Sequence, residues 1–162
     1  MQIKKQIEAL FHPLIGQKAW GASIGYGSFV TIEFGRRHRF DHHDHGEWHL
    51  WLYQCDWELH SGKRLLAHSE SKKHFMELAI DNLNERNLTG MSFDSRLMRT
   101  VFTFDNDLHL ACKPYPDADP DEEYWMLFLP DQQVVSLRES GLKREPADSD
   151  AGKIAGTSVG KK

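Results

Sequence analysis

GEWHLWLYQCDWELHSGKRLLAH, residues 46–68, is the most apolar stretch of the chain and decides the fold. Successive residues of a strand point to opposite faces, and large apolar side chains occupy both registers here. One register holds Trp48, Leu50 and Leu52, and the other holds Trp51, Tyr53, Cys55, Trp57 and Leu59. Polar Gln54 and Asp56 predict a bulge or bend, and Ser61-Gly62 predicts a turn into a second strand. We therefore expect the central strand and hairpin of a sheet that is covered on both faces.

Two helices and several further strands are predicted around this stretch. Residues 2–11 and 71–84 have apolar side chains at helical spacing, and Ser69 or Ser71 is expected to cap the second helix. Period-two alternation between turn signals predicts strands at residues 17–24, 28–34, 89–94, 99–104, 108–113, 124–129 and 133–138. Short turns without a strand–helix–strand rhythm predict an α+β fold, mainly an antiparallel sheet that is curled or sandwiched, with both helices packed on it.

Length and composition indicate one soluble domain. The chain has 162 residues, of which 27% are charged, and no apolar run approaches the roughly 20 residues that span a bilayer. We expect a single globular domain at residues 1–142 and a disordered tail at residues 143–162, which contribute nothing to folding because their apolar side chains are few. The N-terminus lacks the pattern of a signal peptide, so we expect a cytoplasmic protein. Cys55 and Cys112 are expected to be reduced core cysteines.

Two parts of the sequence echo each other, residues 14–71 and residues 88–140. Ile32-Glu33-Phe34 is answered by Phe102-Thr103-Phe104, the strand at 48–52 by 124–128, and residues 64–71 by 133–140. Two such pseudo-repeats would give a sheet-rich body with approximate two-fold symmetry. The offset between the echoes is not constant, and chance matching among alternating strands is the alternative.

The order of GSFVTIEFG, a variable loop and GEWHLWLYQCDWEL resembles a group of small uncharacterised bacterial proteins. The resemblance covers residues 14–140 and rests on structural residues, a Gly-Ser pair, a Phe-Gly pair and the Trp-rich strand. It implies one compact bacterial domain and no particular activity, cofactor or catalytic position.

Residues 36–47, RRHRFDHHDHGE, are the sharpest candidate for chemistry. In an extended segment Asp41, His43 and His45 project to one side and could share a divalent ion such as Zn, Ni or Cu, with His49 further along. The spacing is an objection, because ligands on alternate residues have little rigid scaffolding. A solvated loop with adventitious metal affinity is the alternative.

A second loop, residues 117–123 (DADPDEE), is strongly acidic. It is expected to occupy the corresponding loop of the second repeat, and the calcium-loop pattern of a Gly and a distant Glu is missing from it. We expect the binding surface of the protein to include the basic and the acidic loop together, through Arg36, Arg37, Asp117, Asp119 and Asp121. Two unrelated loops at opposite ends of the sheet are the alternative.

Two functions of different classes follow from these features. A nucleophile elbow, a phosphate loop and a dinucleotide fingerprint are all missing from the sequence, so an enzyme is not favoured. The net charge of −4 argues against nucleic acid as a ligand. We expect a non-catalytic module that binds another cytoplasmic protein, of a toxin-neutralising or adaptor type, with no cofactor and no membrane partner. The alternative is a metal-binding protein or metal-dependent enzyme that uses residues 36–47.

Overall fold

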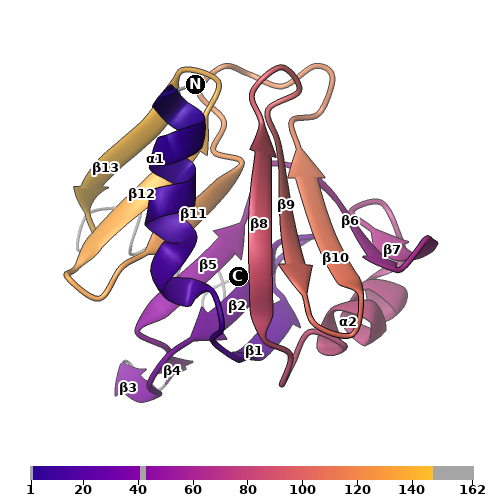
Figure 1. Ribbon diagram of the computed structural model, residues 1–162. Helices are drawn as coiled ribbons and strands as arrows, with labels where there is room; N and C mark the ends of the chain where they lie inside the picture. The colour runs from indigo at the N-terminus through magenta and orange to yellow at the C-terminus, as the bar shows by residue number, and fades with distance from the viewer. Residues whose placement is uncertain (1, 41–42, 148–162) are drawn as a thin grey trace.

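Two antiparallel sheets form the body of the protein (Figure 1). The computed structural model describes residues 2–40 and 43–147. The six-stranded sheet has the order β1-β2-β5-β11-β12-β13, with strands β1 (Ala19–Ile24), β2 (Val30–Phe34), β5 (Trp48–Leu52), β11 (Trp125–Phe128), β12 (Gln133–Arg138) and β13 (Gly141–Pro146). The five-stranded sheet has the order β7-β6-β10-β9-β8, with strands β6 (Asp56–Ser61), β7 (Arg64–His68), β8 (Leu88–Asp94), β9 (Arg99–Phe104) and β10 (Leu108–Lys113). A separate hairpin pairs β3 (His38–Phe40) with β4 (His43–His45). The predicted antiparallel α+β fold is confirmed.

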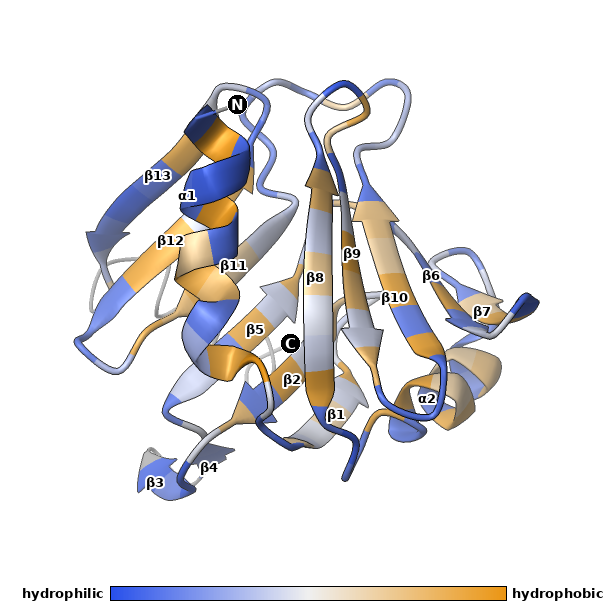
Figure 2. Ribbon diagram, in the orientation of Figure 1, coloured by the Kyte–Doolittle hydropathy of each residue, from blue (hydrophilic) through white to orange (hydrophobic). Residues whose placement is uncertain are grey.

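The helices cover two different places on these sheets. Helix α1 (Gln2–Phe11), followed by a 3-10 turn at His12–Leu14, places the ring of Phe11 5.2 Å from that of Phe102 and 5.1 Å from that of Trp125. It therefore contacts both sheets, and Figure 2 shows apolar and polar residues along the same helix. Helix α2 (Lys73–Asp81) packs against β1 and β7. Among the described residues, no helix is long and apolar enough to cross a membrane.

The start of α2 differs from the prediction. The residue before the helix is Lys72, which is extended and makes no capping hydrogen bond through its side chain. The hydroxyl of Ser69 donates to Asp56 over 2.8 Å, and that of Ser71 accepts from the backbone of His68 over 3.0 Å. Both serines thus stabilise the loop before the helix, and the predicted helix at 71–84 was too long at both ends.

The central stretch of sequence serves both sheets. Strand β5 belongs to the six-stranded sheet and β6 to the five-stranded sheet, and the chain crosses between them at residues 53–55. The predicted bend is this crossing. Cys55 in the crossing and Cys112 in β10 are both buried, as expected of core cysteines. A hydrogen bond with Cys112, together with burial, raises the pKa of Cys55 well above its ordinary value.

Three strands, β3, β4 and β13, were missed by the sequence prediction. Strand β13 pairs with β12 from Gly141↔Arg138 to Pro146↔Gln133. The expected disordered tail from residue 143 is therefore wrong for residues 143–146, and residues 148–162 lie outside the described part. The hairpin of β3 and β4 lies in the segment 36–47, for which an extended loop was expected.

The order of strands relates the two sheets to each other. If the edge strand β13 is set aside, the order β1-β2-β5-β11-β12 can be compared with the order β8-β9-β10-β6-β7. Each of these two sets then has three neighbouring strands from one half of the chain and two from the other. In this order β5 corresponds to β10, whereas the sequence echo matched residues 48–52 to 124–128. The internal repeat itself stays a prediction.

A buried hydrogen bond joins the two sheets through the core, and it can be removed with little change in shape. Trp125 Nε1 donates to Thr100 Oγ1 over 3.1 Å, and neither residue is exposed. We expect Thr100→Val to lower the free energy of unfolding by about 1–3 kcal/mol, because it leaves a buried donor unsatisfied. Chemical denaturation measures this. Thr89→Val, the same change at an exposed hydrogen bond, is the control, and equal losses in both variants would contradict the prediction.

Candidate metal centre

A buried carboxylate and a buried imidazole face each other where β2 and β5 pair. Glu33 and His49 are cross-strand partners, with 5% and 9% of their surfaces exposed. Their neighbours Ile32 and Leu50 point into the main core. Because side chains alternate along a strand, Glu33 and His49 lie on the opposite face of the sheet.

Hydrogen bonds fix both side chains. Glu33 Oε1 accepts from the backbone N–H of Gly46 over 2.8 Å. Glu33 Oε2 is in contact with His49 Nδ1, which must donate if the carboxylate is ionised. His49 Nε2 is buried and has no hydrogen-bond partner within the described residues. One nitrogen of a buried imidazole is therefore left for a further partner.

The β3–β4 hairpin brings a second imidazole to this pair. The ring of His45 lies 5.5 Å from that of His49, in an edge-to-face arrangement, and 6.3 Å from that of His43. Glu33, His45 and His49 each offer one donor atom, and these three atoms all lie within 4.8 Å of one another. We call these three residues the metal-site cluster.

Two glycines make room for the cluster. A Cβ on Gly46 would lie 2.3 Å from the carbonyl oxygen of Phe34, so the link between β4 and β5 rests directly on β2. Gly21 has a positive φ of 62°, and a Cβ there would lie 3.1 Å from Cγ of Glu33. Gly21 therefore leaves space for the buried glutamate beneath it.

The other face of the hairpin carries its ion pairs. The Asp44 carboxylate accepts hydrogen bonds from Arg37 Nη1 over 3.0 Å and from Arg39 Nη1 over 3.1 Å. The guanidinium of Arg37 also lies 4.0 Å from the centre of the Trp20 ring. These groups are exposed, so each pair contributes little stability by itself. They hold the hairpin against β1, and they give the predicted binding residue Arg37 a structural role.

The environment of His45 favours its neutral form. Burial lowers the pKa of His45 most, and the nearby His49, His43 and His38 lower it further, while Glu33 opposes the shift. A neutral imidazole is the form that binds metal ions. The local electrostatics therefore prepare His45 as a ligand.

Of the three predicted metal ligands, the structure brings one into the cluster. His45 belongs to it, His43 lies beside it, and Asp41 lies outside the described residues. The sequence prediction missed Glu33 as a member of the cluster and placed His49 only nearby. The signal for Glu33 was a single carboxylate within a strand, VTIEF, whose five residues are all buried.

The acidic loop lies away from this site. It links β10 to β11 and enters β11 at Trp125, which pairs with Leu52 at the end of β5, whereas His49 lies near the start of β5. The two loops are therefore at opposite ends of β5, which favours the alternative of two separate loops over a joint surface. A binding role for Arg36, Arg37, Asp117, Asp119 and Asp121 stays a prediction. Asp119 accepts from the backbone of Asp121 over 3.0 Å, within its own turn.

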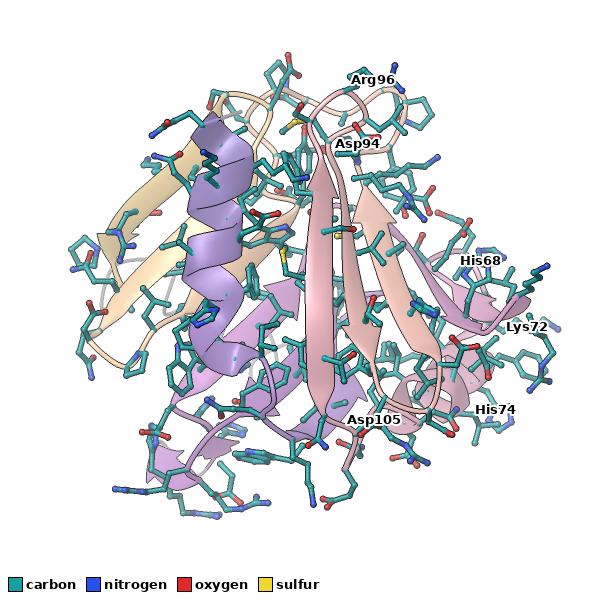
Figure 3. All side chains as sticks on the ribbon, in the orientation of Figure 1. His68, Lys72, His74, Asp94, Arg96 and Asp105 are labelled. Atoms are coloured by element: carbon teal, nitrogen blue, oxygen red, sulfur yellow. The ribbon has the colours of Figure 1, made fainter. Side chains whose placement is uncertain are left out.

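Two other histidines lie elsewhere. His68 and His74, labelled in Figure 3, belong to β7 and α2, on the side of the molecule away from the β3–β4 hairpin. Asp105, also labelled there, accepts from the backbone of Asn87 over 3.2 Å. These residues do not contribute to the metal-site cluster.

No protein-family model, curated protein or solved structure matches this chain.

The cross-strand pair of Thr103 and His109 in the five-stranded sheet can be compared with the pair of Glu33 and His49, because it has the corresponding place in the order of strands. His109 Nε2 bonds to Asp107 over 2.9 Å, and its Nδ1 lies 3.4 Å from the hydroxyl of Thr103. Both nitrogens of His109 thus have a partner, whereas Nε2 of His49 has none among the residues that the structure describes.

The close approach at Gly46 can be tested by adding one methyl group. We expect Gly46→Ala to lower the free energy of unfolding by about 1–3 kcal/mol, because the new Cβ overlaps the backbone of Phe34. Thermal and chemical denaturation measure this. Gly90→Ala is the matched control, since a Cβ there meets nothing within 4 Å. A Gly46→Ala protein as stable as the control would refute the close approach.

The lowered pKa of His45 predicts a pH dependence. Its folded-state pKa lies below the ordinary 6.5, so between the two values the unfolded chain binds more protons than the folded chain. The contribution of His45 to stability is therefore complete above about pH 6.5 and falls as the pH drops below it. NMR titration should show His45 titrating below 6.5, and His45→Gln should flatten the pH dependence of stability. Titration at or above 6.5 would be the contrary result.

Proposed function

We propose that this protein binds a divalent transition-metal ion at the metal-site cluster of Glu33, His45 and His49. The observation that carries the proposal is the convergence of three donor atoms within 4.8 Å of one another, two of them on buried residues. The residues come from β2, β4 and β5, so the fold gathers them from three strands. A site built from separate elements is better scaffolded than the run of alternate residues expected from the sequence.

The chemistry of the donors indicates the class of ion. Two imidazoles with a carboxylate suit Zn²⁺ and its neighbours Ni²⁺ and Cu²⁺, whereas Ca²⁺ and Mg²⁺ prefer oxygen ligands throughout. Zinc lies about 2.0–2.1 Å from each histidine nitrogen, which places two bound rings about 5 Å apart between centres. The ring separation of 5.5 Å between His45 and His49 is close to that value.

A bound ion would connect the hairpin to the sheet. His45 belongs to β4, whereas Glu33 and His49 belong to the six-stranded sheet. An ion that binds only the folded chain stabilises it by RT ln(1 + [L]/Kd), about 2.7 kcal/mol at 100 times Kd. The ion would therefore act as a structural clip.

Binding is favoured over metal-dependent catalysis by the position of a groove of about 770 Å³. The groove runs beside α1 and β13 and is lined by Leu10, Trp48 and Leu142 among others, and none of the three cluster residues lines it. A substrate held in this groove would not contact the side chains of the cluster.

Binding of another protein is a second candidate function, as expected from the sequence for a cytoplasmic bacterial adaptor or toxin-neutralising protein. The observation that favours it is the exposure of Phe75 and Leu78, 54% and 59%, three residues apart on α2. Residues at this spacing lie on one helical face. A partner would cover this apolar face, at a place separate from the metal-site cluster.

Metal binding can be measured directly. The chain purified without an affinity tag is expected to contain near-stoichiometric zinc, nickel or copper by elemental mass spectrometry, and the metal-free protein to bind Zn²⁺ in calorimetry. His49→Ala should weaken binding by more than about 100-fold, because loss of an outer-shell partner alone costs about 10- to 100-fold. His109→Ala is the control, since this histidine is also paired with a carboxylate. Equal binding by both variants, or no binding by the unaltered protein, would end the proposal.

A further inference from the structure

The hydrogen bonds around Glu33 assign different roles to the members of the cluster. We propose that Glu33 is a positioning residue rather than a ligand, and that the ion is bound by three imidazoles, those of His43, His45 and His49, with His49 binding through Nε2. This inference rests on the proposed function and concerns only how the site is built.

Both oxygens of Glu33 are already engaged. Oε1 accepts the backbone N–H of Gly46, and Oε2 accepts the Nδ1–H of His49. With only 5% of its surface exposed, Glu33 is held in this arrangement by the strands on both sides. Each oxygen of the Glu33 carboxylate therefore already has a hydrogen-bond partner without a metal ion.

Unlike Glu33, His49 has a buried polar atom without a hydrogen-bond partner among the described residues. A proton on Nδ1, held by Glu33, leaves a lone pair on Nε2, and this buried nitrogen has no partner among the described residues. A buried acceptor without a partner is costly, and a metal ion would satisfy it. A carboxylate that fixes the tautomer of a ligating histidine is a common outer-shell arrangement at zinc sites.

The hairpin supplies the other two imidazoles. His43 and His45 are two residues apart on β4, so both lie on the same face, opposite to Asp44 and its arginines. The rings follow one another in the order His43, His45, His49, with separations of 6.3 and 5.5 Å between centres. A rotation of the half-buried His43 side chain would complete a site with three imidazoles, whose nitrogens are ligands that zinc accepts.

The nitrogen that binds the ion can be identified by NMR. In the zinc-loaded, ¹⁵N-labelled protein, long-range ¹H–¹⁵N spectra distinguish the two ring nitrogens of each histidine. We expect His49 to keep its proton on Nδ1 and to bind zinc through Nε2. Zinc on Nδ1 with a proton on Nε2 would overturn the inference, because Nδ1 could then no longer donate to Glu33.

Affinities for Zn²⁺ test the roles of Glu33 and His43 separately. The Glu33→Gln variant keeps an oxygen that can accept a hydrogen bond from His49, so its affinity for Zn²⁺ should fall by less than about tenfold. The affinity of the Glu33→Ala variant should fall by about 10- to 100-fold. His43→Ala should weaken binding by at least about tenfold, with His109→Ala unchanged. Glu33→Gln as damaging as His49→Ala would identify Glu33 as a ligand. A loss in His38→Ala without one in His43→Ala would show that the third imidazole is wrongly assigned.

The two proposals fail in different ways. Absence of zinc binding by the unaltered protein refutes the proposed function. Binding with zinc on Nδ1 of His49, or with the Glu33 result above, refutes only the assignment of roles. Circular dichroism of each variant identifies any loss of affinity that comes from unfolding.

Discussion

One segment of the chain has to lie in two sheets, and the rest of the architecture follows from this constraint. Strand β5 has large apolar side chains on both faces, and exposing either of them to water would cost free energy. Strand β6 buries Trp57 and Leu59 on one face, in the same core as Leu50 and Leu52 of β5, and exposes Glu58 on the other. The crossing at residues 53–55 solves this by giving each strand neighbours in a different sheet. Helix α1 then covers the place where the sheets meet, with Phe11 between Phe102 and Trp125.

The candidate site follows from a second constraint, the burial of a carboxylate. An ionisable group inside a strand whose five residues are all buried requires hydrogen bonds. Glu33 obtains them from His49 across the sheet and from the backbone of Gly46. The second bond fixes the end of the β3–β4 hairpin upon β2, and this carries His45 to the ring of His49. The same contacts that satisfy the glutamate thus assemble the donors.

Sequence patterns predicted several elements with the bounds that the structure gives them. Helix α1 and strands β9, β10 and β12 have the predicted bounds, because one face of each meets the core. Strand β13 escaped prediction, since an edge strand with exposed Lys143 and Arg144 owes its order to backbone pairing rather than to apolar residues. The many histidines and aspartates of residues 36–47 predicted His45 as a metal ligand. The contribution of Glu33 depends on the register between β2 and β5 and on the folding back of the hairpin, which no local pattern encodes.

The exchange of strands between the sheets has a consequence for synthesis on the ribosome. Strand β5 finds one neighbour, β2, early in the chain, while its other neighbour is β11, which pairs Trp125 with Leu52. Until β11 has emerged, the most apolar strand of the protein has an open edge of backbone donors and acceptors, which is a template for aggregation. Such non-local pairing also folds slowly. The edge of β5 that pairs with β11 therefore stays unpaired from the synthesis of Leu52 until that of Trp125.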